Sequence, residues 1–364
     1  MGKIRVLVVD DSAFMRKLIP DLLSEEEKIE VIGTARNGQD AVKKVELLNP
    51  DVITMDVEMP IMNGLEALKK IMKQFPKPVI MLSSTTKEGA QNAILSLQDG
   101  AFDFIAKPSG AISLDLYKVK EELIKKVLLA KSANIGKLQR NPNIKNSINK
   151  EKRYSKIDSH FNNRQLYIPK SNSLKSIVCI GTSTGGPRAL QQVLPKLPAD
   201  IDVPIFIVQH MPSGFTESLA NRLNSISRII VKEARHGEEV KKGVAYIAPG
   251  GSHLKVQKSG NSLKVILDKT DPRNGHRPSV DELFEALSEL PDYRKIAVIL
   301  TGMGSDGTEG LKKLKLSGAV NAITESEQSS IVFGMPKSAQ KTNLVDKVEH
   351  LDNIAASIME FIRK

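Results

Sequence analysis

Short apolar runs alternate with amphipathic stretches along most of the chain, and this alternation constrains the fold more than any other feature of the sequence. Between residues 3 and 130 the β-type runs are uniformly apolar, as in parallel strands that are covered on both faces. The stretches between them place apolar residues three and four positions apart, which predicts helices. The pattern therefore predicts an α/β unit of the (βα)5 type with a doubly wound parallel sheet. The expected strands are Ile4–Val9, Ile29–Ala35, Val52–Met55, Val79–Ser83 and Phe102–Ile105, and the expected helices are Ala13–Leu23, Gln39–Leu48, Gly64–Gln74, Glu88–Gln98 and Tyr117–Leu129.

The alternation resumes near residue 175 and predicts a second, mostly parallel doubly wound α/β unit. Two β-type runs, Leu254–Gln257 and Leu263–Leu267, flank a short polar stretch that contains Gly260, which predicts an antiparallel hairpin inserted on that sheet. The other expected strands are Ile177–Ile180, Pro204–Val208, Ile229–Lys232, Val244–Ile247, Ile296–Leu300 and Val320–Thr324, and the expected helices are Pro187–Leu197, Phe215–Ser225, Val280–Leu290, Glu309–Leu316, Pro336–Thr342 and Leu351–Ile362.

The segment between the two units carries most of the formal net charge of +11. Residues 131–176 contain 11 Lys or Arg and 2 Asp or Glu, a balance of 11 − 2 = +9, so the rest of the chain carries +2. The segment is rich in Asn, Lys and Ser and has no periodicity, which favours a flexible basic linker over a nucleic-acid-binding arm. We therefore predict domains at residues 1–128 and 175–364, joined by a linker at residues 129–174.

The composition also excludes several kinds of site. The single cysteine, Cys179, excludes a disulfide within the chain and a thiolate zinc site, and its place in an apolar run predicts buried packing. No signal peptide is expected, and no apolar run approaches the ~18–20 residues of a membrane span. The expected setting is the cytoplasm, without membrane insertion.

Polar side chains in the first unit gather where the expected strands end. Asp10 and Asp11 follow one strand, Asp56 follows another, and Ser83 and Lys107 end two more. Carboxylates that converge at one edge of a sheet repel one another and call for a counter-ion, and oxygen ligands suit Mg²⁺. With the cation bound, one carboxylate could attack a phosphoryl donor and form an acyl phosphate. The plainer alternative is a set of helix caps and loop acids.

This constellation resembles the receiver domain of two-component response regulators, a flavodoxin-like fold. The resemblance covers residues 1 to about 128, and it implies a histidine kinase as phosphodonor. It also implies Asp56 as the phosphoacceptor, a Mg²⁺ site at Asp10, Asp11 and Asp56, switch residues Ser83 (or Ser84) and Phe104, and Lys107 before a cis proline, Pro108.

A second chemistry lies at the start of the second unit. Residues 181–185, Gly-Thr-Ser-Thr-Gly, follow an apolar run and precede a helix, which is the G-x-S-x-G pattern of an exposed nucleophilic serine, Ser183. The serine needs a base. His210 ends the next expected strand, and consecutive parallel strands are usually neighbours, so the two side chains should emerge at one edge of the sheet.

The third member of such a triad should be a carboxylate at another strand end. Asp306 lies in a glycine-rich loop directly after the strand Ile296–Leu300, where it could hold the imidazole in the correct tautomer. Asp200 and Asp202 are rivals, but they precede their strand and should lie at the opposite edge. The order Ser, His, Asp disfavours the α/β-hydrolases, in which the acid precedes the histidine.

Two other functions fit parts of this half. Gly302-x-Gly304-x-x-Gly307 with Glu325 matches a dinucleotide-binding fingerprint, but Asp306 would lie beside the pyrophosphate. A DNA-binding output domain would require a basic helix-turn-helix, whereas residues 175–364 show α/β alternation.

Five motifs occur in an order that resembles the catalytic domain of chemotaxis protein-glutamate methylesterases, the CheB family. They begin at Gly181, Gln209, Ala248, Arg277 and Gly302, and the likeness spans about residues 175–362. The resemblance implies a triad of Ser183, His210 and Asp306, an oxyanion hole at the Met303 backbone N–H, and no cofactor for the ester chemistry. It implies a phosphorylation-activated monomer that demethylates glutamyl esters and deamidates glutamines on chemoreceptors. The roles of Arg277, His253 and His276 stay open.

Overall fold

The N-terminal half of the chain folds around a parallel five-stranded sheet. A computed structural model describes residues 2–107, 113–131, 133, 136, 138 and 175–364. The strand order is β2-β1-β3-β4-β5, and every neighbouring pair is parallel. The elements are β1 (Ile4–Val9), α1 (Ala13–Ser24), β2 (Ile29–Ala35), α2 (Gly38–Leu48), β3 (Val52–Asp56), α3 (Gly64–Gln74), β4 (Val79–Ser83), α4 (Lys87–Gln98), β5 (Asp103–Ala106) and α5 (Ser113–Ala130).

Side-chain caps place the helices of this unit directly after their strands. Ser12, Asn37, Asn63 and Thr86 each accept a hydrogen bond from a backbone N–H in the first turn of the helix that follows. The loops are therefore short, and the carboxyl ends of the strands meet at one edge of the sheet. The predicted fold class is confirmed for this unit.

The C-terminal half contains a seven-stranded sheet in the order β14-β13-β12-β6-β7-β9-β8, in which all strand pairs are parallel. The elements are β6 (Lys175–Thr182), α7 (Gly186–Val193), β7 (Ile205–Gln209), α8 (Phe215–Ile226), β8 (Ile230–Glu233), β9 (Val244–Ile247), β10 (His253–Ser259), β11 (Ser262–Asp268), α9 (Val280–Ser288), β12 (Tyr293–Ile299), α10 (Thr308–Leu316), β13 (Val320–Glu325), α11 (Met335–Gln340), β14 (Lys347–Glu349) and α12 (Ile354–Arg363), with two short 3₁₀ helices, η1 (Leu194–Lys196) and η2 (Leu351–Asn353).

Two details of this half differ from the sequence prediction. The predicted hairpin forms, but β10 and β11 make a separate two-stranded antiparallel sheet instead of joining the large one. The edge strand β14 was not predicted, because three residues are too few to show a hydrophobic period.

The large sheet is covered by helices on both faces, and successive residues of its central strand β6 show this. Val178 and Ile180 pack with α7, α8 and α12, whereas Ile177 and Cys179 pack with α9 and α10. Burial raises the pKa of the Cys179 thiol, so the residue acts as a small apolar side chain, as predicted. None of the helices among the described residues has the length and apolar character to span a membrane.

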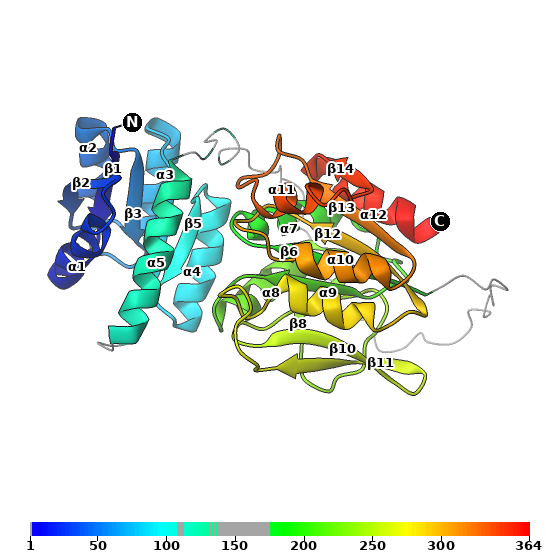
Figure 1. Cartoon of the computed structure of the whole chain (residues 1–364). Helices are drawn as coiled ribbons and strands as arrows, with labels where there is room; N and C mark the ends of the chain where they lie inside the picture. Colours follow the sequence, from blue (N-terminus) through cyan, green and yellow to red (C-terminus); the bar gives the residue numbers. More distant parts are fainter. Residues whose placement is uncertain (1, 108–112, 132, 134–135, 137, 139–174) are drawn as a thin grey trace.

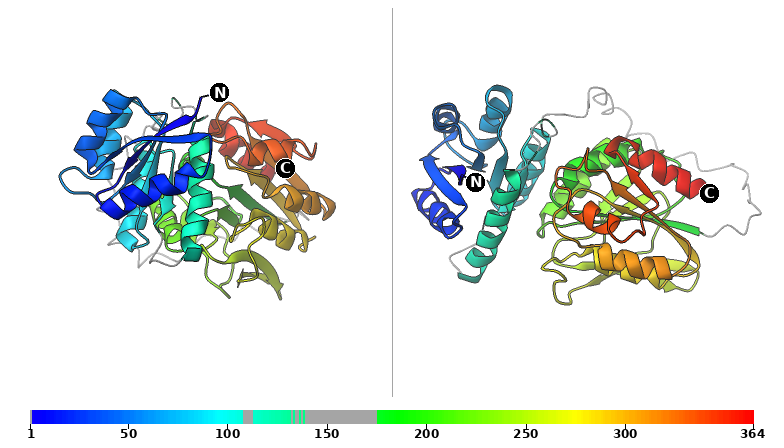
Figure 2. Two further views of the ribbon diagram at one scale, coloured as in Figure 1. Left: turned by 60° about the vertical axis from the view of Figure 1, so that its left-hand side comes forward. Right: turned by 45° about the horizontal axis from the view of Figure 1, so that its top comes forward.

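The two halves pack against each other through α4, which lies beside α7 and α8 (Figure 1). Figure 2 shows the same arrangement from two other directions. The ring of Phe104 at the end of the N-terminal sheet stacks on Phe215 at the start of α8, with centroids 4.8 Å apart. Most of the predicted linker, residues 139–174, and the predicted cis proline, Pro108, lie outside the described residues.

Candidate functional site

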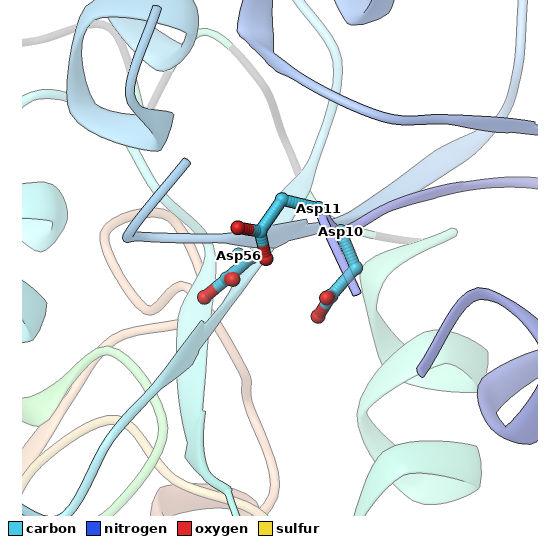
Figure 3. Close-up of side chains that lie close together, drawn as sticks. All are labelled: Asp10, Asp11 and Asp56. Atoms are coloured by element: carbon cyan, nitrogen blue, oxygen red, sulfur yellow. The ribbon is translucent and has the colours of Figure 1, made fainter. Parts of the chain in front are cut away.

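Three carboxylates meet at the edge of the N-terminal sheet, as Figure 3 shows. Asp10 follows β1, Asp56 ends β3, and Asp11 lies beside them in the loop after β1. One oxygen of each carboxylate lies within 4.8 Å of the others. Asp10 and Asp56 are buried, while Asp11 is exposed. A hard cation with oxygen ligands fits this donor set, because the cluster holds three acids in a small volume.

Lys107 partly compensates this concentration of negative charge. Its Nζ lies 2.8 Å from Asp56 Oδ2 and 3.0 Å from Asp10 Oδ2. Burial nevertheless raises the pKa of Asp56 to about 6, and the charge of Asp10 adds to this effect. Without a cation, the folded protein therefore binds a proton at Asp56 more tightly than the unfolded chain does.

The raised pKa of Asp56 predicts that the ionised carboxylate lowers the stability of the folded protein. The substitution Asp56→Asn should remove this pH-dependent loss of stability. Because the folded-state pKa is about 6 and the unfolded value is 3.8, wild-type stability should fall as pH rises from about 4 to about 6 in EDTA. The free energy of unfolding of Asp56→Asn relative to wild type should increase by about 3 kcal/mol over this window. Urea denaturation of the N-terminal domain at a series of pH values measures it.

Asp21→Asn is the matched control for this experiment, since Asp21 is an exposed carboxylate of the same domain. Its stability should follow the wild-type curve at every pH. Parallel curves for wild type and Asp56→Asn would contradict the raised pKa.

The predicted switch residues Ser83, Ser84 and Phe104 contact groups other than the three carboxylates. The buried hydroxyl of Ser83 donates to the carbonyl oxygen of Gly89 in the first turn of α4, at 2.7 Å. The hydroxyl of Ser84 donates to Glu58 Oε1 at 3.3 Å. Phe104 is 4% exposed and lies at the contact with the C-terminal half, against Phe215. The edge that carries the carboxylates is therefore connected to the domain contact through β5.

Ser183 and His210 follow neighbouring strands of the C-terminal sheet. In the pairing of β6 with β7, Thr182 lies opposite Gln209, so the two site residues come one position later on each strand. The His210 N–H donates to the carbonyl oxygen of Thr182 at 3.2 Å, and Gln209 Nε2 donates to the carbonyl oxygen of Ser183 at 3.0 Å. The backbones of the candidate nucleophile and candidate base are thus held side by side.

His210 is bonded to Asp306 through one ring nitrogen. Nε2 lies 2.7 Å from Asp306 Oδ2, whereas Nδ1 is buried and has no hydrogen-bond partner among the described residues. An ionised Asp306 accepts the proton of Nε2, which leaves the lone pair of Nδ1 as the basic position of a neutral ring. The rival Asp202 pairs with Lys242 at 2.7 Å and precedes β7, at the other end of that strand.

The carboxylate of Asp306 accepts donors from the N-terminus of α9. Oδ1 accepts from the Ser279 hydroxyl at 2.8 Å and the Asp281 N–H at 3.0 Å, and Oδ2 accepts from the Val280 N–H at 2.7 Å. Burial alone would raise the pKa of Asp306, but the bond and charge of His210 and these amide donors hold it below its ordinary value. His210 and the N-terminus of α9 together therefore keep the carboxylate ionised.

Asp281 fixes the loop that carries Asp306, and sequence reasoning assigned it no role. Its Oδ1 accepts from the N–H groups of Gly307 at 2.9 Å and Gly310 at 2.7 Å. Burial, with repulsion from Asp306, raises the pKa of Asp281 to about 6. The sequence signal was the Pro-Ser-Val-Asp run ahead of a helix, but only the fold brings that run to Asp306.

The structure gives different contacts to His276, His253 and Arg277, the three residues whose roles the sequence left open. His276 stacks on the catalytic candidate His210, with ring centroids 3.8 Å apart, and burial and the charge of His210 lower its pKa to about 4. His253 accepts from the Ser279 N–H with Nδ1 and donates to the Asp271 carbonyl with Nε2. Arg277 donates to backbone carbonyls of a neighbouring loop. His253 and Arg277 therefore bond to the backbone of neighbouring loops, whereas His276 touches the candidate base itself.

The loop after β12 passes close to Ser183. A Cβ on Gly302 would lie 2.8 Å from the Ser183 Cβ, so only glycine lets the backbone approach this closely. The next residue, Met303, is half-buried, and its N–H makes no hydrogen bond within the described part of the chain. A free backbone donor thus lies one residue from this close approach.

The same loop does not have the features of a dinucleotide site. Glu325, the acid expected on the ribose, is buried, and its Oε2 accepts from the Thr301 N–H at 2.8 Å. Asp306, inside the glycine fingerprint, is bonded to His210. The acid that the fingerprint would need for the ribose, Glu325, is thus used within the protein, and Asp306 would place a negative charge beside the pyrophosphate.

Comparisons with known proteins agree with the division of the chain into an N-terminal and a C-terminal unit. A family model described as CheB methylesterase matches residues 178–358, and one described as response regulator receiver domain matches residues 6–116. A protein-glutamate methylesterase/protein-glutamine glutaminase of Bacillus subtilis (strain 168) is 54% identical over 361 residues, which is 99% of each chain. A relative of the same name from Geobacillus kaustophilus (strain HTA426) is 55% identical over 362 residues, covering 100% of this chain and 99% of its own. The crystal structure of the Thermotoga maritima CheB methylesterase catalytic domain is 46% identical, with a TM-score of 0.50, and covers 51% of this chain and 98% of its own.

Proposed function

The chain belongs to the CheB methylesterase family, and from this premise we propose that it hydrolyses glutamyl γ-methyl esters, and the amides of certain glutamines, in chemoreceptors. It is a protein-glutamate methylesterase with protein-glutamine glutaminase activity, and its receiver domain places that activity under the control of phosphorylation. The proposed setting is the cytoplasm, where a monomer meets the receptor and its kinase. A DNA-binding or dinucleotide-binding output is not favoured.

The contact between His210 Nε2 and Asp306 Oδ2 carries the proposed mechanism, together with an Nδ1 that has no partner among the described residues and a His210 backbone bonded to Thr182, next to Ser183. The Ser183 oxygen attacks the ester carbonyl while Nδ1 of His210 takes its proton. Asp306 stabilises the imidazolium that forms. The imidazolium then protonates the leaving group, which is methanol from an ester and ammonia from an amide. Water attacks the acyl-enzyme in the second half-reaction, again with His210 as base, and the glutamate carboxylate is released.

The Met303 N–H is the proposed donor to the oxyanion of the tetrahedral intermediate. Its lack of a partner in the described residues and the close approach of Gly302 to Ser183 support this role. A fixed backbone donor needs no rearrangement when charge develops on the substrate oxygen, which is why such donors lower the barrier.

In the receiver domain, Asp56 is the proposed phosphoacceptor and a histidine kinase the proposed phosphodonor. The donor set of Asp10, Asp11 and Asp56 fits Mg²⁺, which would neutralise charge on the incoming phosphoryl group when bound. Lys107, already 2.8 Å from Asp56, is the proposed partner of the phosphoryl oxygens. Ser83 or Ser84 would donate a hydrogen bond to the same group.

The domain contact provides a route by which phosphorylation controls the esterase. Thr184, next to the nucleophile, donates a hydrogen bond to Asp103 Oδ2 of the receiver at 3.0 Å, and both side chains are buried. Ser183 itself is 9% exposed. We expect phosphorylation to shift the population toward an arrangement in which the receiver leaves this surface, because the covered serine cannot accept a protein substrate.

Methanol release from a methylated receptor cytoplasmic fragment tests this function. The full-length chain should release methanol, and acetyl phosphate with Mg²⁺ should raise the rate by at least about tenfold. Asp56→Asn should keep the basal rate and lose the stimulation. Release that is absent in every condition would overturn the esterase, whereas equal rates with and without acetyl phosphate would overturn only its control.

A further inference from the structure

Three N–H-bearing side chains line the surface of the C-terminal domain that the receiver covers. Arg188 and Gln191 lie on α7 and Arg222 lies on α8, the two helices that pack against α4. Arg188 is 7% exposed and Gln191 is 6% exposed. We call these three residues the donor face. It belongs to the same surface as the serine loop, because α7 begins three residues after Ser183 and Thr184 contacts the receiver as well.

The groups that cover the donor face are neutral and satisfy it only in part. Arg188 Nη2 donates to the backbone carbonyl oxygen of Leu138, in the segment that joins the domains. Arg222 Nη2 donates to Gln98 Oε1 at 3.2 Å, and Gln98 Nε2 donates to Gln191 Oε1 at 2.9 Å. Three buried donor atoms have no partner among the described residues: Arg188 Nη1, Gln191 Nε2 and Arg222 Nε.

The two guanidinium groups also lack counter-ions, since neither forms an ion pair with a carboxylate in the part of the chain that the structure describes. Burial lowers the pKa of Arg188 to about 10 and lowers that of Arg222 as well. A buried cation without an acid is costly for a protein. Among the described residues, the receiver and the segment that joins the domains therefore cover this face without matching its charge.

A partner that reaches Ser183 must displace the receiver and then lies against the donor face. Unpaired guanidinium and amide N–H groups favour an occupant that presents carboxylates, because charge-assisted bonds to Arg are the strongest that this face can form. A substrate helix carries side chains at three- and four-residue spacing beside the reacting one, so acids at those positions could reach the flanking helices α7 and α8.

We propose that Arg188 and Arg222 bind acidic side chains that flank the methylated glutamate on the substrate helix, and so select esters in acidic surroundings. The inference rests on the proposed function and adds a substrate preference to it. The receiver then inhibits the esterase by occupying the donor face with neutral groups, whereas the face is suited to the acidic side chains of a substrate. An acidic substrate and the receiver compete for the same donors.

Two synthetic helical peptides test the preference with the full-length chain, acetyl phosphate and Mg²⁺. Both contain one glutamate γ-methyl ester; one has glutamates four residues before and after it, and the other has alanines there, which the glutaminase activity cannot alter. Methanol release should give a KM about tenfold lower for the acidic peptide, with similar kcat. The difference should shrink between about 50 mM and about 300 mM NaCl, because salt screens the exposed charges.

Arg188→Gln and Arg222→Gln should each raise KM for the acidic peptide about fivefold and change KM for the neutral peptide less than about twofold. Arg228→Gln is the matched control, since it removes an exposed arginine just after α8 and should change neither value. Arg222→Glu with a peptide that has lysines at the flanking positions should restore a low KM. This reversal remains informative if the buried Arg188 variant does not fold.

Equal KM values for both peptides, or variants that raise both KM values alike, would overturn the inference and leave the esterase in place. In that case the donor face would serve only to dock the receiver. Absence of methanol release from both peptides by the unaltered chain would overturn the proposed function, and this inference with it.

Discussion

Ser183→Ala is expected to lower kcat for methanol release from a methylated receptor fragment by about 10⁵–10⁶-fold. The variant lacks the oxygen that we propose attacks the ester, so no acyl-enzyme should form. The residual rate would come from the Met303 N–H and from substrate binding. Phosphorylation of Asp56 should be unchanged, because the acidic cluster lies in the other domain, on a separate sheet.

The control for this variant is Ser305→Ala, which removes an exposed hydroxyl from the loop that also carries Asp306. It should keep wild-type kcat within about twofold, as exposed surface positions usually do. A Ser183→Ala protein that still labels at Asp56 and still releases methanol at the wild-type rate would show that another group is the nucleophile.

Asp306→Asn is expected to lower kcat by about 10⁴-fold. Every hydrogen-bond partner of this carboxylate among the described residues is a donor: the His210 ring, the Ser279 hydroxyl, and the N–H groups of Val280, Asp281 and Gly307. The amide NH₂ of asparagine therefore opposes a donor in either orientation. Where it faces His210, it stabilises the tautomer with the proton on Nδ1, which cannot accept the proton of Ser183.

The same substitution should cost stability in a pH-dependent manner. The folded-state pKa of Asp306 lies below its ordinary value of 3.8, so the stabilisation by its ionised form is present above about pH 4 and is lost as pH falls below that point. The stability difference between wild type and Asp306→Asn should therefore be full at neutral pH and shrink in acid. Chemical denaturation at pH 7 and at about pH 3 measures it.

Asp292→Asn makes the same chemical change at an exposed carboxylate that pairs with Lys258. Its kcat and stability should stay close to wild type, because exposed ion pairs contribute little. Wild-type kcat in Asp306→Asn would remove this carboxylate from the proposed mechanism.

Periodicity predicted most of the secondary structure because the strands of both sheets are buried on both faces and the helices on one. Each apolar run of β1 through β5 corresponds to a strand, and the predicted α/β class is confirmed in both halves. The prediction failed where local pattern carries no information. The strand β14 is too short to show a period, and the hairpin β10–β11 offers no sequence signal for which sheet, if any, its edges join.

Residues at strand ends could be nominated from sequence, because parallel strands bring their carboxyl ends to one edge. That rule nominated Asp10, Asp56, Ser183, His210 and Asp306 without knowledge of the structure. It did not identify Asp281 or His276 as their neighbours. These two lie in and before α9, and their distance in sequence from β6 and β7 gives no indication of contact.

The sequence by itself determined the two sheets, the chemistry at each edge and the order of the domains, because hydrophobic period and residue type are local properties. Only the tertiary structure decided which nitrogen of His210 faces Asp306, which donors hold that carboxylate ionised, and which donors of α7 and α8 the receiver leaves unpaired. Those outcomes depend on distances and burial between segments far apart along the chain. Hydrogen bonding and desolvation act across space, so a linear pattern does not record them.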